Sequence, residues 1–512
     1  MLARAVARHP HAPALVDRRA RHTFAELDAA SARAARALRS LGIGPGDRVA
    51  AALPNRAEVV VAFLATARLG AVWVGINRGL TPPERIRLLA DSGAAVLLAP
   101  PGAEAELAAV RPDADLALRA VVSVNPDDDD QWSRLQAEAA SAELEQPRPD
   151  PFRAAAIAYT SGTTGDPKGV VHTHRNLVVP GAAAIDAGLV GPDTRAGAAL
   201  ALTVLNVMTL TVVASLQAGA TTVVIDRTDA EGLADWIARE RVTALSAVPT
   251  LYHDLAASEA VSAEILASLS YATVGGAACP EGLRELCLER FGMDLLAGYG
   301  LTEAPTSLTR ERRGQSHVPG GVGPALPHVR IEIRDDDDLP VPAGIEGRIC
   351  AGAARWGRWA DVYTPMAGYW NRPEETATAL SGGLLRTGDL GTLDAEGNLS
   401  VLGRQGEVIA RGGADVHPGE VESVLLADPR VVACAVVGVP DERLGQRVAA
   451  FVELKPGSEA SPEDLRVVCG RQLARYKVPE VLEVVAALPR NAMGKVMKAA
   501  LVSRPPLHEQ SE

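Results

Sequence analysis

The chain has 512 residues and a formal net charge of -12 at pH 7, with 47% hydrophobic, 22% charged and 4% aromatic residues. This length exceeds what one hydrophobic core usually organises, so we expect at least two domains. The composition is that of an ordered globular protein and argues against global disorder. The negative charge and the lack of a Lys/Arg-rich stripe exclude a nucleic-acid partner held through its phosphates, and favour a small-molecule substrate.

Cysteine usage and the N-terminal sequence indicate a compartment. The five cysteines are widely spaced and form no CxxC pair, so we predict reduced, mostly buried thiols rather than a zinc site or a redox couple. The N-terminal sequence MLARAVARHPHAPALVD lacks the uninterrupted apolar core of a signal peptide. No segment approaches the ~18 apolar residues of a membrane span. We therefore predict a cytoplasmic protein without an integral membrane segment.

The first part of the chain has an α/β pattern. Helix-period stretches such as residues 24–42 alternate with short apolar runs such as residues 48–53 and 94–99. Residues 102–153 are weaker in pattern and are predicted to be an exposed connection. Four later apolar runs are candidate buried strands: residues 154–160, 220–226, 242–248 and 269–276. This alternation predicts one large α/β body with largely parallel sheets.

The sequence also contains two runs of acidic residues, and its predicted secondary structure changes near residue 404. We interpret residues 127–130 and 335–338 as solvated turns rather than cation sites, because no EF-hand spacing surrounds them. After Arg404 the pattern becomes compact α+β over about a hundred residues. We therefore expect a large multi-sheet α/β domain at residues 1–403 and a small α+β domain at residues 404–512.

A glycine-rich segment, YTSGTTGDPKGV at residues 159–170, follows one candidate strand. It carries four hydroxyl side chains from Ser and Thr, three glycines and Lys168, which offer many donors with little steric bulk, so phosphate is the favoured ligand. The spacing from Gly162 or Gly165 to Lys168 does not fit GxxxxGK[ST], so a P-loop NTPase fold is not predicted. A flexible linker is disfavoured because the segment lies between two apolar runs.

This segment resembles, over all its residues, the signature loop of the adenylate-forming superfamily of acyl-CoA synthetases, firefly-type luciferases and peptide-synthetase adenylation domains. The resemblance implies a large N-terminal domain, a small mobile C-terminal domain and ATP as a substrate. In that family the loop binds the triphosphate. The residues to which the resemblance gives this role are Thr160, Ser161, Gly162, Thr163, Thr164, Gly165 and Lys168.

Two further motifs resemble the family's adenine and acyl segments. YGLTE implies that the Tyr299 ring lies on adenine beside Gly300, that Thr302 contacts the α-phosphate and that Glu303 helps hold Mg2+. A ring face suits a purine, a hydroxyl can donate to phosphate, and a carboxylate is a hard metal ligand. GGAA at residues 275–278 resembles a segment whose small residues let adenine and the acyl chain approach the backbone, with an ordinary turn as the alternative. It implies that Gly276 and Ala277 contact the nucleotide, and that Gly275 and Gly300 line the acyl pocket.

The remaining motifs resemble the ribose and catalytic segments. TGDLG assigns to Asp389 the acceptance of hydrogen bonds from both ribose hydroxyls. Arg404 matches the family arginine that also reaches the ribose, and a surface arginine in a turn is the alternative. PRNAMGKVMK resembles the segment with the catalytic lysine, which corresponds to Lys495. A lysine between the attacking carboxylate and the α-phosphate neutralises both anions.

These motifs together imply an enzyme that uses ATP and Mg2+ to convert a small-molecule carboxylic acid into an acyl-adenylate and pyrophosphate. The small domain then rotates and a thiol displaces AMP. Gly412 and Gly413 resemble the segment that lines the thiol tunnel. Coenzyme A is the expected thiol, because no carrier domain follows Lys498 and the C-terminal segment resembles that of acyl-CoA synthetases. A homodimer is one arrangement that the sequence leaves open.

Two departures from the family pattern affect this reading. Acyl-CoA synthetases usually read PxFHxxG where this chain reads TVLNVMTL at residues 203–210, so Leu205 replaces the aromatic residue and Asn206 the histidine. The smaller side chains favour a bulky aliphatic or polycyclic acid, with neutral drift in a core strand as the alternative. At the hinge the family has Asp or Lys and this chain has Gly406, which frees the backbone.

These departures motivate an alternative in which adenylation is weak and the enzyme mainly passes a supplied acyl-adenylate to coenzyme A. The intact Lys168, Glu303 and Lys495 argue against it. A luciferase-like oxygenase and a non-catalytic nucleotide-binding protein are less favoured. The insertion-like residues 352–370 leave two roles open, a reshaped rim of the site or an oligomer contact.

Overall fold

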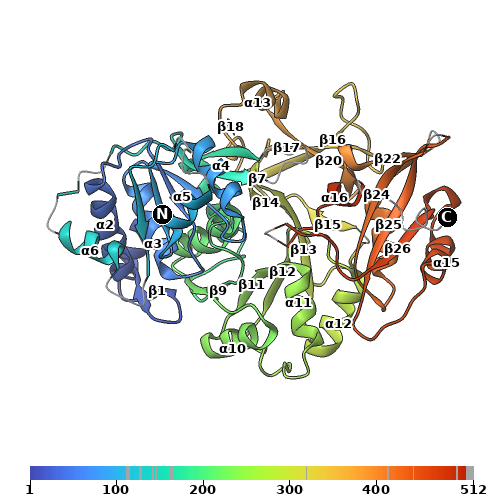
Figure 1. Cartoon of the computed structure of the whole chain (residues 1–512), viewed down its shortest axis with the longest axis horizontal. Helices are drawn as coiled ribbons and strands as arrows, with labels where there is room; N and C mark the ends of the chain where they lie inside the picture. The colour runs from blue at the N-terminus through green and yellow to red at the C-terminus, as the bar shows by residue number, and fades with distance from the viewer. Residues whose placement is uncertain are drawn as a thin grey trace.

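The computed structural model describes residues 1–110, 116–125, 130–140, 143–144, 147–160, 167–318, 320–411, 414–441, 443–491 and 494–502. Within these residues the strands form four sheets, of eight, seven, six and five strands. Figure 1 shows the chain that follows β21 (Asn398–Arg404) gathered at one side of the molecule, beside a larger body formed by the preceding residues. The mixed α/β class predicted from the sequence is confirmed.

The seven-stranded sheet has the order β18-β8-β7-β4-β3-β5-β6 and is parallel from β7 to β6. Its strands are β3 (Arg48–Ala51), β4 (Val72–Gly75), β5 (Val96–Ala99), β6 (Ala120–Ser123), β7 (Ala154–Thr160), β8 (Lys168–Thr173) and β18 (Gly368–Tyr369). The helices that connect these strands are α3 (Ala57–Arg68), α4 (Pro82–Ser92), α5 (Ala103–Val110) and α6 (Gln131–Glu138).

The prediction that residues 102–153 form an exposed connection is wrong. They contain α5, the edge strand β6, which pairs in parallel with β5, and α6. Trp132 of α6 is only 2% exposed. The burial pattern of the segment is weak because only Val122 is buried in the edge strand β6 and only Trp132 in α6, so neither element has a regular period of buried positions.

The eight-stranded sheet has the order β14-β13-β12-β11-β9-β10-β1-β2 and is parallel from β13 to β1. Its strands are β1 (Pro13–Val16), β2 (Arg21–Thr23), β9 (Arg195–Ala198), β10 (Thr221–Val224), β11 (Ala244–Ala247), β12 (Tyr271–Val274), β13 (Leu295–Leu301) and β14 (Ala304–Arg310). The helices in this part of the chain are α1 (Ala3–Arg8), α2 (Phe24–Ser40), α7 (His174–Asp186), α10 (Ala230–Glu240), α11 (Pro249–Ala257) and α12 (Glu281–Phe291).

The segment that departs from the family pattern is helical. Residues 205–218 form α8 (Leu205–Val207), the π-helix η1 (Met208–Val213) and α9 (Ala214–Ala218), so the interpretation as a core strand is wrong. A continuous apolar run does not distinguish a buried strand from a buried helix. Gly75 at the end of β4 allows the backbone just before this segment to pack closely against β4. A Cβ at Gly75 would lie 1.9 Å from the Thr203 carbonyl oxygen.

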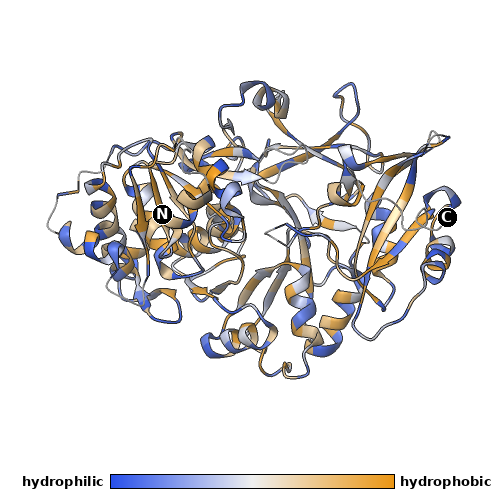
Figure 2. Cartoon of the chain, viewed as in Figure 1, coloured by the Kyte–Doolittle hydropathy of each residue, from blue (hydrophilic) through white to orange (hydrophobic). Residues whose placement is uncertain are grey.

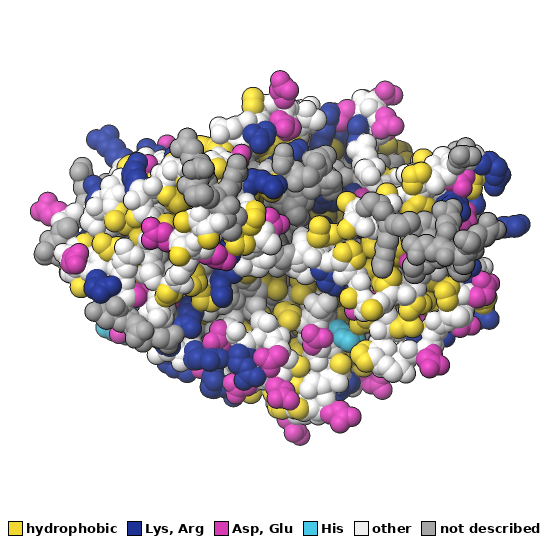
Figure 3. Space-filling view, in the orientation of Figure 1, with side chains coloured by type: hydrophobic (Ala, Val, Ile, Leu, Met, Phe, Trp, Pro, Cys, Tyr) yellow, Lys and Arg dark blue, Asp and Glu magenta, His cyan; other side chains and the backbone are white. Residues whose placement is uncertain are grey.

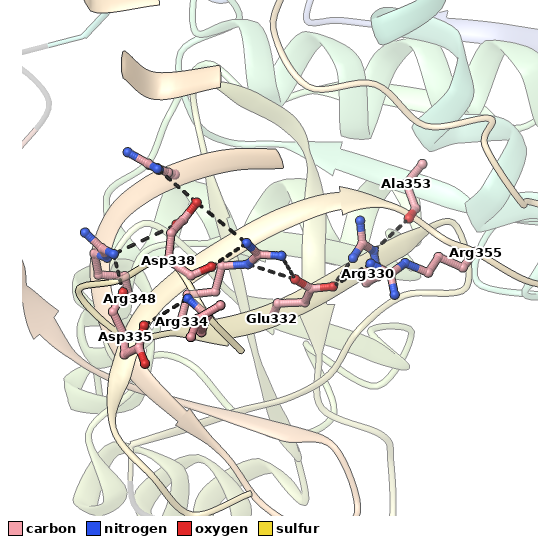
Figure 4. A network of polar contacts seen from close by, with 10 residues as sticks. Arg330, Glu332, Arg334, Asp335, Asp338, Arg348, Ala353 and Arg355 are labelled. Carbon is pink, nitrogen blue, oxygen red and sulfur yellow. Dashed lines mark hydrogen bonds and ion pairs between the residues drawn. The ribbon is translucent and has the colours of Figure 1, made fainter. Parts of the chain in front are cut away.

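The six-stranded sheet is antiparallel and has a polar face. Its strands are β15 (Gly321–Pro324), β16 (Val329–Arg334), β17 (Gly347–Ala353), β19 (Leu380–Ser381), β20 (Leu384–Leu393) and β21, with α13 (Pro373–Ala379) before β19. Figure 4 shows arginines from β16 and β17 converging on Glu332 and Asp338. The Arg386 guanidinium lies 3.0 Å from Asp338 and that of Arg334 lies 2.6 Å from Glu332.

The interpretation of the two acidic runs as solvated turns is only partly right. Asp336 and Asp337 are exposed, but Asp338 is half-buried and paired with arginine. Residues 126–129 lie outside the described residues. Asp130 is buried and accepts a hydrogen bond of 2.7 Å from the Ser133 amide, so it caps the N-terminus of α6.

The small body has a five-stranded sheet and its own core. Its strands are β22 (Ile409–Arg411), β23 (Ala414–Val416), β24 (Val431–Asp441), β25 (Gly445–Leu454) and β26 (Val481–Val485). Its helices are η2 (Gln405–Glu407), α14 (Pro418–Leu426), α15 (Pro462–Gln472), η3 (Arg475–Lys477) and α16 (Ala499–Val502). Figure 2 shows apolar residues concentrated on these strands, and Val436, Val448 and Leu465 are fully buried.

Three sequence expectations concern the chain as a whole. All five cysteines are free and three are buried, so the prediction of reduced thiols is confirmed. Over the part of the chain that the structure covers, no helix combines the length and apolar character needed to cross a membrane. Figure 3 shows acidic and basic side chains interspersed on the face in view.

Candidate active site

Thr302 and Glu303 form the tight turn between β13 and β14, where Leu301 pairs with Ala304. The register of the two strands shifts between Tyr299 and Leu301. Gly300 permits this irregularity, because a Cβ at that position would lie 2.6 Å from the Thr306 carbonyl oxygen. The YGLTE motif therefore projects two polar side chains from a rigid hairpin.

Two side chains, the buried His172 and the half-buried Asn206, form hydrogen bonds to the backbone of this turn. The His172 Nε2 lies 2.8 Å from the Thr302 carbonyl oxygen, and burial lowers the pKa of His172 to about 4. The imidazole is therefore neutral and donates to the carbonyl. Asn206 donates to the Leu301 carbonyl at 3.3 Å, and its Oδ1 accepts no hydrogen bond from the residues described.

Three predicted ribose and adenine residues come together on β13, β20 and β21. Tyr299 donates a hydrogen bond from its hydroxyl to Asp389, which is 7% exposed. The Arg404 Nε lies 3.4 Å from the other carboxylate oxygen of Asp389, and the two residues are paired across β20 and β21. Burial raises the pKa of Asp389 despite these two partners. The arrangement joins residues from three separate motifs.

Lys495 belongs to the small body and lies close to this cluster. A turn closed by the Arg490–Val496 bridge presents it, and its amide donates to Asn491 Oδ1 at 3.0 Å. Desolvation of the ammonium group, followed by repulsion from Arg404, lowers the pKa of Lys495, while Asp389 acts in the opposite sense. The lysine predicted to be catalytic therefore lies within electrostatic reach of the ribose residues.

A second contact also joins the small body to the large one. His417, at the start of α14, is 7% exposed, and its Nε2 lies 2.9 Å from the Glu346 carboxylate in the segment before β17. A Cβ on Gly419 would lie 3.0 Å from the Leu402 carbonyl oxygen, so α14 packs closely on β21. These contacts hold the small body in the position that brings Lys495 to the site.

Most of the glycine-rich loop lies outside the described residues. This applies to Ser161, Gly162, Thr163, Thr164 and Gly165. The ends of the loop are held together, because Thr160 of β7 pairs with Lys168 of β8. The glycines at 412 and 413, predicted to line the thiol tunnel, also lie outside the described residues.

The other predicted residues have simple surroundings. Gly276 has a φ of +79°, which favours glycine, and Gly275 and Ala277 flank it in the loop after β12. Leu205 is 4% exposed and packs in the main core. Gly406 lies in η2, and a Cβ there would meet no described atom within 4 Å.

Sequence reasoning missed His172 and Tyr369. The Tyr369 hydroxyl donates to Glu303 Oε1 at 3.0 Å, and the Lys168 ammonium lies 5.3 Å from the centre of its ring. Burial and the Glu303 carboxylate raise the pKa of Tyr369, so its hydroxyl stays protonated. The available signal was the GYW sequence in the insertion-like segment, but nothing in it indicated Glu303 as a partner.

The residues present fit a magnesium ion that is shared with the nucleotide. No group of three or more His, Cys, Asp or Glu residues that could hold a metal occurs in the described ranges. Mg2+ commonly binds one or two carboxylates and completes its shell with substrate phosphates and water. Glu303 has one carboxylate oxygen occupied by Tyr369, and the chemistry of this donor suits such a shared site.

Comparisons with known proteins agree with the motifs. The profile of the AMP-binding enzyme family matches residues 2–370, and that of the AMP-binding enzyme C-terminal domain matches residues 420–495. The long-chain-fatty-acid–CoA ligase of Mycobacterium tuberculosis is 34% identical over 485 residues, covering 94% of this chain and 92% of its own. The feruloyl-CoA synthase of an Amycolatopsis species is 33% identical over 496 residues, covering 97% of this chain and 96% of its own.

Among solved structures, the o-succinylbenzoate CoA synthetase of Bacillus subtilis, in complex with its acyl-adenylate intermediate, has a TM-score of 0.84 at 30% identity. The match covers 99% of this chain and 98% of that one. The chain belongs to the family of AMP-binding enzymes, the adenylate-forming acid–thiol ligases that its motifs resemble.

Proposed function

We propose that this enzyme is an acyl-CoA ligase. It converts a carboxylic acid and ATP into an acyl-adenylate and pyrophosphate, and then transfers the acyl group to coenzyme A. The observation that carries the proposal is the gathering of Tyr299, Asp389, Arg404 and Lys495 from four motifs and two bodies at one place. The names of the relatives support the same reaction class.

In the first half-reaction the acid's carboxylate attacks the α-phosphorus and pyrophosphate leaves. Asp389 accepts hydrogen bonds from the ribose, and Lys495 lies between the two anions that must approach each other. Lys168 contacts the triphosphate, and Thr302 donates to the α-phosphate. Glu303 and the phosphates would hold Mg2+, which when bound would supply positive charge to offset that of the pyrophosphate.

In the second half-reaction the thiol of coenzyme A attacks the acyl carbon and AMP leaves. We propose residues 1–403 and 404–512 as the two domains, with Gly406 as the hinge. Rotation there would withdraw Lys495 and bring Gly412 and Gly413 to the thiol tunnel. Rotation is part of the proposal because Lys495 lies near Asp389 and Arg404, and it would have to leave that position before another part of the small body could face the site.

Membership of the family does not identify the carboxylic acid that is the substrate. The relatives act on a long-chain fatty acid, on a feruloyl group and on o-succinylbenzoate, which differ in size and polarity. Leu205 and Asn206 replace larger family residues beside the expected pocket, which Gly275 and Gly300 would also line. A bulky aliphatic or polycyclic acid is the substrate class that we propose.

The test uses a panel of carboxylic acids, from short aliphatic to polycyclic, with two readouts for each acid. Pyrophosphate release reports adenylation, and thioester formation reports transfer to coenzyme A. At least one acid should give both, and the largest kcat/KM should lie among the bulky acids. Absence of both products with every acid, including from synthetic acyl-adenylates, would contradict the proposal.

The same experiment separates the complete ligase from an enzyme specialised for the second half. Such an enzyme would form thioester from a synthetic acyl-adenylate and release little pyrophosphate from the free acid and ATP. The closeness of Lys495 to Asp389 and Arg404 favours the complete ligase. Vigorous acid-dependent pyrophosphate release would rule out the specialised form.

A further inference from the structure

The insertion-like residues 352–370 end in a short strand that lies against the strand after the glycine-rich loop. In β18, Gly368 pairs with Val171 and Tyr369 with Val170. The Trp370 amide donates to the Gly169 carbonyl at 2.7 Å. Lys168 begins the same strand, β8, so Tyr369 is fixed to the backbone that carries Lys168.

The same short segment also holds the turn that carries Glu303. The Met366 amide donates to the Glu303 carbonyl oxygen at 2.8 Å. The Tyr369 hydroxyl donates to Glu303 Oε1 at 3.0 Å. The segment therefore binds both the backbone and the side chain of Glu303, which lies on a different sheet from Lys168.

Tyr369 is the side chain that contacts both charged groups. Its hydroxyl is bonded to the Glu303 carboxylate, and the Lys168 ammonium lies 5.3 Å from the centre of its ring. A phenol bonded to one carboxylate oxygen fixes the orientation of the carboxylate and leaves the second oxygen to a cation. A ring face attracts an ammonium group without neutralising its charge, so Lys168 stays available to phosphate.

We propose that Tyr369 is a positioning residue for the Mg2+-bound triphosphate, which orients the Glu303 carboxylate toward the metal and holds Lys168 beside it. This inference rests on the proposed function, because it assumes that ATP binds at this site. It gives the end of the insertion-like segment a role at the rim of the nucleotide site.

The hydroxyl can be tested separately from the ring. Tyr369→Phe removes only the bond to Glu303 and keeps both the ring under Lys168 and the β18 pairing. Tyr369→Leu removes the ring as well. Tyr363→Phe is the matched control, because the Tyr363 hydroxyl lies in the same segment, is 2% exposed and has no hydrogen-bond partner among the described residues.

The measurement is the binding of ATP by isothermal titration calorimetry, with Mg2+ and with EDTA. For Tyr369→Phe, affinity should fall about tenfold with Mg2+, as expected for loss of a hydrogen bond to a charged group, and by less than about twofold in EDTA. For Tyr369→Leu, affinity in EDTA should fall as well, by about two- to fivefold, because Lys168 loses the ring. Tyr363→Phe should bind like the wild type in both buffers.

Three results would overturn the proposal. The first is a Tyr369→Phe variant that binds ATP like Tyr363→Phe in both buffers. The second is an equal loss with and without Mg2+, which would indicate a structural role alone. The third is a wild-type chain that binds no ATP, which would overturn the proposed function as well. If the wild type binds ATP and releases pyrophosphate, the proposed function stands even where the Tyr369 variants contradict the positioning role.

Discussion

Two buried neutral histidines should make the large body sensitive to mild acid. Burial lowers the pKa of His172 and of His328 from 6.5 to about 4, and the two residues are 0% and 1% exposed. Because the folded pKa lies below the unfolded one, the unfolded chain binds protons more tightly. The stability that these residues contribute is therefore complete above pH 6.5 and is lost as the pH falls toward 4.

The proton-linkage relation gives about 2 kcal/mol lost per imidazole at pH 5, hence about 4 kcal/mol for the pair. The assay is urea unfolding at pH 8 and at pH 5, for the wild type and for a His172→Gln/His328→Gln variant. Glutamine is the suitable replacement, because its amide can donate to the Thr302 carbonyl and the Thr306 hydroxyl as Nε2 does. The wild type should lose about 4 kcal/mol more than the variant between the two pH values. Equal losses would refute the assignment of both histidines as buried neutral groups, since all other titrating groups are common to the two chains.

Three further predictions concern the site and the hinge. Lys495→Ala should lower pyrophosphate release at least about 100-fold and leave thioester formation from a synthetic acyl-adenylate within a few-fold of wild type. Because the pKa of Lys495 is lowered, the rate of adenylation by the wild type should decline with rising pH before pH 10.5. The variant should lack this decline. Gly300→Ala should destabilise the protein by about 1–3 kcal/mol in urea unfolding and weaken ATP binding, because the new Cβ would lie 2.6 Å from a backbone oxygen; unchanged stability would contradict the observed geometry. Gly406→Ala should leave the urea midpoint unchanged or stabilise by up to about 1 kcal/mol, and a clear destabilisation would show that this position is constrained.

The motifs named residues that the structure brings together, but they did not indicate the residues that support them. Tyr299, Asp389 and Arg404 each lie in a local pattern of residues, and the structure brings them into contact. His172 and Tyr369 act through partners that are 130 and 66 positions away in the chain. A single histidine in a strand and a single tyrosine in an insertion carry no periodic or spacing signal, so only the folded chain reveals such contacts.

The fold shows the same division between local and long-range information. Alternation of helices and apolar runs predicted the parallel sheets, because burial on both faces makes such strands almost continuously apolar. It failed at β6, an edge strand in which only Val122 is buried, and at residues 205–218, where a buried helix is as apolar as a strand. Sequence patterns indicate what is buried more reliably than which element buries it.

Gly406, which we propose as the hinge, has no contact among the described residues of this structure that requires glycine. At Gly406 a Cβ would meet no described atom within 4 Å and the backbone does not need glycine, so a side chain is tolerated here. Under the proposed function, a freer backbone at Gly406 would matter only during or after the rotation of the small body. Any rotation about this position must break the contact between His417 and Glu346, because the two residues lie on opposite sides of it in the chain. If Gly406 is a flexible hinge, the His417–Glu346 contact would be the main barrier to rotation. The lifetime of this contact, rather than the stiffness of the hinge, would then determine how long Lys495 remains at the site.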